Sequence, residues 1–190
     1  MDVNAADTAW LMVSSAMVML MTPGVALFYA GMVRRKNVIS TTMMSFTALG
    51  VVGMLWVLYG YTLSFGPDTG GMIGGLSYIF LRGVGQVPSS IYATTVPHLA
   101  FLSFQGMFAI ITVALISGAV VERIRFGALL LFSVVWLTFV YCPVAHWVWG
   151  DGGWLLELGA LDFAGGTVVH ICAGFSTLAL AIALGPRNGY

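Results

Sequence analysis

Charged residues are scarce in this chain of 190 residues. Only 7% of the residues are Asp, Glu, Lys or Arg, whereas 59% are hydrophobic, and seven cations balance seven carboxylates. Soluble domains carry about 25% charged residues, and a soluble fold of this size has too little interior to hide so much apolar surface. A bilayer is therefore the expected solvent. Zero net charge offers no basic surface for nucleic acid.

Lysine and cysteine are rarer still. The single lysine, Lys36, lies between two apolar segments, so no buried lysine is available for a retinal Schiff base. Cys142 and Cys172 both fall in apolar segments, which predicts small buried side chains and no disulfide framework. HExxH, Walker, nucleophile-elbow and CxxC patterns are missing, so we expect neither an enzyme nor a metal or other cofactor. Haem ligation by His146 and His170 is conceivable but disfavoured, because His146 falls near a predicted membrane interface.

Five apolar stretches predict an all-α integral membrane protein, because about 20 helical residues suffice to cross the hydrocarbon layer. They cover residues 8–33, 38–65, 98–121, 126–148 and 164–185. Pro23 and Gly24 interrupt the first stretch, which a membrane helix tolerates. The longest connection, 66–97, is rich in Gly, Pro and Ser, and its middle part, 72–81, predicts a short interfacial helix.

Basic residues fall almost entirely at one end of the predicted helices. Only Arg82 lies at the opposite end. The other six are Arg34, Arg35, Lys36, Arg123, Arg125 and Arg187. By the positive-inside rule, the amino terminus and the 66–97 loop lie outside a cell (inner or plasma) membrane, and residue 187 lies on the cytoplasmic side.

A carboxylate and a histidine mark the start of the fifth apolar stretch. We expect Asp162 to cap a helix that begins at Phe163, and Gly165 and Gly166 to allow close helix approach. His170 would then lie about 12 Å deeper, where an ionisable side chain is a functional candidate. A neutral imidazole can guide a polar molecule or relay a proton. The alternative is a histidine packed against a neighbouring helix.

Three phenylalanines in the third stretch share one helix face. They are Phe101, Phe104 and Phe108. Helix packing or lipid contact is the commoner role of such a face, and the alternative is a stacked pair, Phe104 over Phe108, that closes a pore. Trp149 is either an interfacial tryptophan or, with these rings, part of a cation site. His98 and His146 are expected to be interfacial or packing residues.

Four segments, taken together and in order, resemble the ammonium transporter (Amt/Mep/Rh) family. They are residues 21–34 (MTPGVALFYAGMVR), 118–126 (GAVVERIRF), 145–150 (AHWVWG) and 162–170 (DFAGGTVVH). The resemblance implies the first half of a fold with two inverted five-helix halves and an eleventh helix, in which the substrate path lies between the halves. We therefore expect a fragment of a longer protein, or a second half supplied by another chain. Alone, these residues should not form a closed pore.

The resemblance also implies roles for single residues. Phe104 and Phe108 match the phenylalanines that gate the family's pore. Phe108 and Trp149 match the aromatic walls of its external cation site, and His170 matches the first of two pore histidines.

Two further positions match the family near its outer vestibule. Asp162 matches an aspartate with a mainly structural role, and Gln105 matches a family position beside the gate. The family implies recruitment of ammonium or methylammonium outside, deprotonation, and passage as ammonia through a homotrimer with one channel per subunit. A PII-type regulatory protein or a fused signalling domain is a possible cytoplasmic partner. An ammonium sensor is the alternative function, and a purely structural half-subunit is a weaker one.

Overall fold

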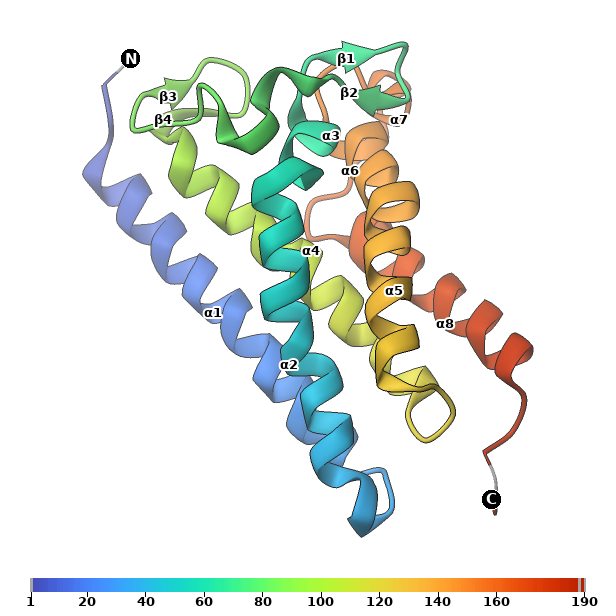
Figure 1. Ribbon diagram of the computed structural model, residues 1–190. Helices are drawn as coiled ribbons and strands as arrows, with labels where there is room; N and C mark the ends of the chain where they lie inside the picture. Colours follow the sequence, from blue (N-terminus) through green and yellow to red (C-terminus); the bar gives the residue numbers. More distant parts are fainter. Residues whose placement is uncertain (1, 188, 190) are drawn as a thin grey trace.

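Five long helical segments form a bundle in the computed structural model, which describes residues 2–187 and 189 (Figure 1). All five are apolar and long enough to cross a membrane. The expected all-α membrane fold is therefore confirmed.

The first two segments pack against the third, helix α4. Helix α1 spans Ala5–Ala30, where we expected 8–33, and it continues through Pro23 without a break. The second segment joins a 3₁₀ turn (Arg35–Asn37), α2 (Val38–Leu55), a π-helical turn (Trp56–Gly60) and α3 (Tyr61–Phe65). Helix α4 spans His98–Val120 and packs against α1, α2 and α8.

The last two segments each contain a further π-helical turn. Helix α5 (Phe126–Trp136) continues through a π-helical turn (Leu137–Tyr141) into α6 (Cys142–Trp149), and a short helix α7 (Trp154–Glu157) follows. The fifth segment begins with a π-helical turn (Gly166–Ile171) and continues as α8 (Cys172–Leu184). The expected start at Phe163 is wrong, because Gly165 takes a left-handed conformation (φ 78°) that ends the irregular chain just before the helix.

The long connection forms no continuous helix over 72–81. It contains strands β1 (Asp68–Thr69) and β2 (Ile73–Gly74), which pair as an antiparallel hairpin, and β3 (Pro88–Ser89) and β4 (Ala93–Pro97), which pair as a second one. Between them, a 3₁₀ segment covers Leu76–Leu81 and is broken by non-helical residues. The expected helix is thus present only as this shorter, broken 3₁₀ segment. Gly70 (φ 66°) and Gly71 (φ 73°) instead allow the tight first hairpin.

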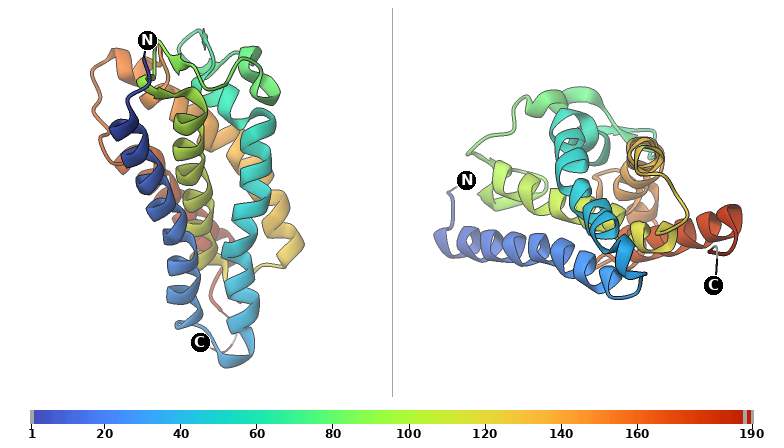
Figure 2. Two further views of the ribbon diagram at one scale, coloured as in Figure 1. Left: turned by 90° about the vertical axis from the view of Figure 1, so that its left-hand side faces the viewer. Right: turned by 60° about the horizontal axis from the view of Figure 1, so that its bottom comes forward.

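The loops divide cleanly between the two ends of the bundle (Figures 1 and 2). The strands, α7 and the start of α1 share one end, which we call the strand end, and the Asn4 amide donates there to the Thr95 carbonyl at 2.8 Å. The α1–α2 connection, the α4–α5 connection and the end of α8 share the other, which we call the basic end. All cations except Arg82 therefore belong to the basic end.

Close helix packing in the core depends on two small residues of α4. Gly106 lies under Trp56, whose indole Nε1 donates to the Leu102 carbonyl at 3.1 Å, and a Cβ at Gly106 would come within 2.8 Å of the indole. Gly118 likewise leaves room for Tyr29, whose hydroxyl donates to the Leu115 carbonyl at 2.9 Å. These contacts anchor α1 and α2 to α4.

Candidate functional site

An aromatic cavity of about 490 Å³ lies at the strand end. Its walls come from α3, α4, α6, the chain just before β4 and the irregular segment before the fifth helix. The lining residues with an aromatic ring or a polar side chain are Phe65, Tyr92, Phe101, Gln105, Trp149, Asp162 and Phe163. We call this space the aromatic cavity.

Trp149 is held in one orientation at the edge of this cavity. Its indole Nε1 donates to the backbone carbonyl of Asp162 at 3.0 Å. Its ring packs at 66° against Phe108, with 6.2 Å between the ring centroids. The two expected walls of the cation site are therefore in contact, although Phe108 itself lies behind the cavity lining.

The phenylalanines of α4 do not form the expected stack. The rings of Phe104 and Phe108 lie 4.9 Å apart at 86°, which is an edge-to-face pair, one of the preferred arrangements of aromatic rings. The prediction of a stacked pair is thus wrong in geometry, although the two rings do touch. Phe101 points elsewhere and stacks on Tyr92 at 5.7 Å and 8°.

Asp162 caps the fifth helix from a position four residues before its start. Its carboxylate accepts the backbone N–H groups of Gly166 (2.8 Å), Thr167 (2.8 Å) and Val168 (2.9 Å). These are donors that a helix start leaves free. The expected capping is present, with the residues 163–165 looped out between cap and helix.

Gln105 lines the aromatic cavity and carries an unused acceptor. Its Oε1 atom is buried and has no hydrogen-bond partner within the part of the chain that the structure describes. Leaving a buried acceptor unpaired costs about 1–3 kcal/mol. A ligand with N–H groups in the cavity would remove that cost.

His170 lies apart from the aromatic cavity. It is exposed and lines a shallow apolar hollow of about 340 Å³ on the outer side of the fifth helix, with Ile171, Gly174, Phe175 and Leu178. The helix begins at Gly166, so His170 lies only in its second turn. The expected depth of 12 Å below Asp162 treated residues 163–165 as helical, and they are not. The pore role of His170 stays a prediction.

The other two histidines are packed within the bundle. His98 is buried, and its Nε2 lies 2.5 Å from the Tyr61 hydroxyl. His146 is fully buried and contacts Ser64 and Asp68. Both are packed inside the protein, which is one of the two roles expected for them.

Of the two cysteines, Cys142 is fully buried and Cys172 is half-buried. Both have free thiols. The expectation of small buried side chains therefore fits Cys142, whereas Cys172 keeps partial exposure on the fifth helix.

Tyr92 is a cavity residue that sequence reasoning missed. Its hydroxyl accepts the Asp151 amide N–H at 2.8 Å, just beyond Trp149, and burial raises the pKa of this phenol to about 12. It lies in the long connection, where no helical periodicity gives a signal. Only the fold brings it to the cavity.

A charged cluster ties the loops together at the basic end. Glu122 adopts a left-handed backbone (φ 62°), and its Oε1 accepts the Asn37 amide at 2.5 Å and the Arg34 Nε at 3.2 Å. Hydrogen bonds from Asn37 and Arg34 lower the pKa of Glu122 to about 2. The only acidic residue at this end therefore works as a structural link between two loops.

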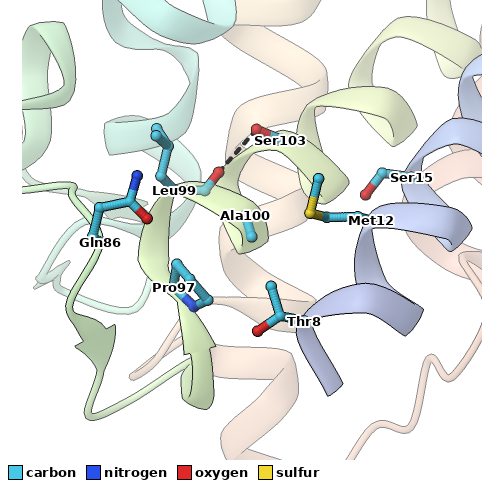
Figure 3. Close-up of a pocket in the computed structure, with 8 residues that line it drawn as sticks. All are labelled: Thr8, Met12, Ser15, Gln86, Pro97, Leu99, Ala100 and Ser103. Atoms are coloured by element: carbon cyan, nitrogen blue, oxygen red, sulfur yellow. Dashed lines mark hydrogen bonds between the residues drawn. The ribbon is translucent and has the colours of Figure 1, made fainter. Parts of the chain in front are cut away.

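A second cavity, of about 450 Å³, lies between the strand-end turns of α1 and α4 (Figure 3). Three hydroxyls line it, from Thr8, Ser15 and Ser103, and each donates to the carbonyl four residues earlier in its own helix. It therefore presents mainly apolar surface and few free polar groups. It is a poorer place for a small cation than the aromatic cavity.

Comparison with known proteins gives one consistent result. The model of the Ammonium Transporter Family matches residues 9–190. An ammonium transporter of Bacillus subtilis is 57% identical over 182 residues, which are 96% of this chain and 44% of that protein. The crystal structure of Candida albicans Mep2 with a G343C mutation superposes with a TM-score of 0.89 at 43% identity, covering 97% of this chain and 40% of that one.

A structure described as a sensor Amt protein is more distant. It superposes with a TM-score of 0.86 at 30% identity, over 95% of this chain and 44% of that one. The chain thus spans less than half the length of the relatives it matches, and the matches fall on their first five-helix half, as the four motifs led us to expect. Its relatives are named as transporters, not enzymes. The chain belongs to the ammonium transporter family.

Proposed function

We propose that this chain is the first half of a membrane transporter for ammonium, with the strand end outside the cell membrane and the basic end in the cytoplasm. The observation that carries the proposal is the aromatic cavity, which is lined both by Trp149, fixed by its bond to Asp162, and by Gln105, whose side-chain oxygen is unpaired. The resemblance to the Bacillus subtilis ammonium transporter supports the choice of substrate.

The chemistry of the cavity suits ammonium better than potassium. Both ions are attracted to aromatic faces, which contribute roughly 0.5–2 kcal/mol each. Only ammonium can also donate a hydrogen bond to Gln105 and later give up a proton. An apolar path beyond the cavity then excludes potassium, because it offers no replacement for the ion's hydration shell.

Passage follows from recruitment in this proposal. Ammonium rests at the aromatic cavity and gives one proton to water there, and ammonia passes the Phe104–Phe108 pair toward His170. His170 faces the outside of this half, in an apolar hollow. The missing wall of the path is assigned to the second half of the fold, and a homotrimer is the expected assembly.

A sensor is the second candidate function. The sensor Amt structure shares this half of the fold, so the aromatic cavity alone does not separate the two roles. We rank transport first because of the higher identity to a transporter. A sensor would signal through a domain or a PII-type partner at the basic end.

Uptake of labelled methylammonium into liposomes that contain the full-length protein tests the proposal. We expect saturable uptake that ammonium inhibits and that an equal concentration of potassium leaves unchanged. Specific binding without uptake would favour the sensor. If the protein shows no binding and no uptake, both candidates are contradicted.

A further inference from the structure

A buried histidine of α6 has a hydrogen-bond acceptor at each ring nitrogen. His146 Nδ1 lies 3.0 Å from the Ser64 carbonyl oxygen, and its Nε2 lies 2.9 Å from Asp68 Oδ1. A carbonyl oxygen and an ionised carboxylate can only accept hydrogen bonds. Both ring nitrogens must therefore carry a proton when Asp68 is ionised, which makes the ring an imidazolium.

The surroundings of Asp68 favour its ionised form. Both carboxylate oxygens also accept the Gly71 amide N–H, at 2.7 and 3.0 Å. The hydrogen bond from His146, followed by the one from Gly71, lowers the pKa of Asp68. Other titratable groups near the pair include Tyr92, whose phenol is neutral, and Cys142, one turn before His146 on α6. A third is Asp151, next to Gly152, which packs on the Asp68 side chain.

This pair sits beneath the turn that follows Trp149. The Gly150 amide donates to the His146 carbonyl at 2.9 Å, and a Cβ at Gly150 would collide with the His146 ring. Trp149 is the last residue of α6, three positions after His146, so both lie in the same helical turn. Any shift of His146 therefore moves Trp149.

Two neutral hydrogen bonds reinforce the same junction. The Trp147 indole donates to the Met72 carbonyl at 2.7 Å, and the Trp154 amide donates to the Gly71 carbonyl at 3.2 Å. The first hairpin is thus fastened to the chain on both sides of Trp149. Among the described residues, only the bond between Asp68 and His146 joins this hairpin to the buried part of α6.

We propose that His146 is held as a buried imidazolium and that its hydrogen bond to Asp68 positions Trp149 for substrate recruitment. The second part rests on the proposed transport function, and the first does not. His146 and Asp68 touch no substrate in this scheme. They are positioning residues that set the indole in the aromatic cavity.

Nuclear magnetic resonance of the full-length protein, labelled with ¹⁵N at its histidines, tests the charge. The His146 signals are assigned by their loss in His146→Gln. We expect both ring nitrogens to be protonated at neutral pH in the wild type and in the control Trp147→Phe, which removes a neutral bond of the same hairpin. In Asp68→Asn we expect a neutral ring, because the amide can donate to Nε2. A neutral ring in the wild type would overturn the proposal.

Methylammonium uptake tests the positioning. Asp68→Ala should raise the half-saturation concentration about fivefold, the equivalent of one lost hydrogen bond, and leave the maximal rate nearly unchanged. Asp68→Asn keeps a hydrogen bond and should stay close to the wild type. Equal loss in both variants, or no change in Asp68→Ala, would refute positioning. If Asp68→Ala does not fold, the ring signals of the wild type and of Asp68→Asn still decide whether Asp68 holds the His146 ring in its charged form. If transport fails but the wild-type ring is cationic, the transport proposal and the positioning role both fall, and the buried imidazolium stands.

Discussion

Replacing Asp162 with Ala tests the helix cap and separates it from substrate binding. The change removes the acceptor of three backbone N–H groups at the start of the fifth helix. Gly166 is exposed and Thr167 half-buried, so water replaces most of what they lose, whereas Val168 is buried. One buried N–H without a partner costs about 1–3 kcal/mol, and cap replacements cost about 1 and at most about 2 kcal/mol. We therefore expect the free energy of unfolding to fall by about 2 kcal/mol.

Equilibrium unfolding of the full-length protein in mixed detergent micelles, followed by circular dichroism, measures this loss. Asp162→Asn keeps one acceptor oxygen and should lose about half as much. Phe163→Ala, a change at a fully exposed neighbour that takes no part in the cap, is the control and should unfold like the wild type. Wild-type stability of Asp162→Ala together with lost methylammonium uptake would refute the reasoning, because Asp162 would then act on the substrate itself.

Three further changes probe the cavity, the pore and the basic end. Gln105→Leu removes the unpaired buried oxygen, so the protein should become about 1 kcal/mol more stable while the half-saturation concentration for methylammonium rises about fivefold; lower stability with unchanged uptake would contradict this. His170→Ala should abolish uptake or admit potassium, measured as potassium-dependent current across a bilayer, and unchanged flux and selectivity would remove His170 from the pore. Glu122 has a pKa of about 2, below its ordinary 4.5, so its stabilising effect is complete above about pH 4.5 and disappears as the pH falls toward 2. Glu122→Gln should reduce this part of the acid sensitivity in thermal unfolding, and an identical pH profile would show that the carboxylate does not link the loops.

The sequence predicts the bundle well because a bilayer demands long apolar helices. Apolar length identifies all five helices, and the distribution of Arg and Lys predicts which loops share an end. Helix starts are harder to predict. The left-handed turn at Gly165 delays the fifth helix, and hydropathy does not register such a turn, because residues 163–165 are as apolar as the helix that follows.

Most of the site residues that could be predicted lie on helices, with Asp162 as the exception. Helical spacing and resemblance group Phe104, Phe108 and Trp149. The angle between the two Phe rings depends on packing, and in the structure the rings are nearly perpendicular. Tyr92 and Asp68 reach their partners through irregular chain, whose path no periodic pattern encodes. Loop residues near the site therefore required the structure.

The half-saturation concentration of Trp149→Leu for methylammonium tests the central claim most directly, with Trp147→Leu as the matched control. Trp147 lies on the same helix but its indole bonds to Met72, outside the aromatic cavity. If the cavity recruits ammonium, the first variant loses a cation–π contact worth roughly 0.5–2 kcal/mol, so its half-saturation concentration rises about two- to thirtyfold, while Trp147→Leu stays near the wild type. Equal effects of both changes, or none from Trp149→Leu in a folded protein, would contradict the account.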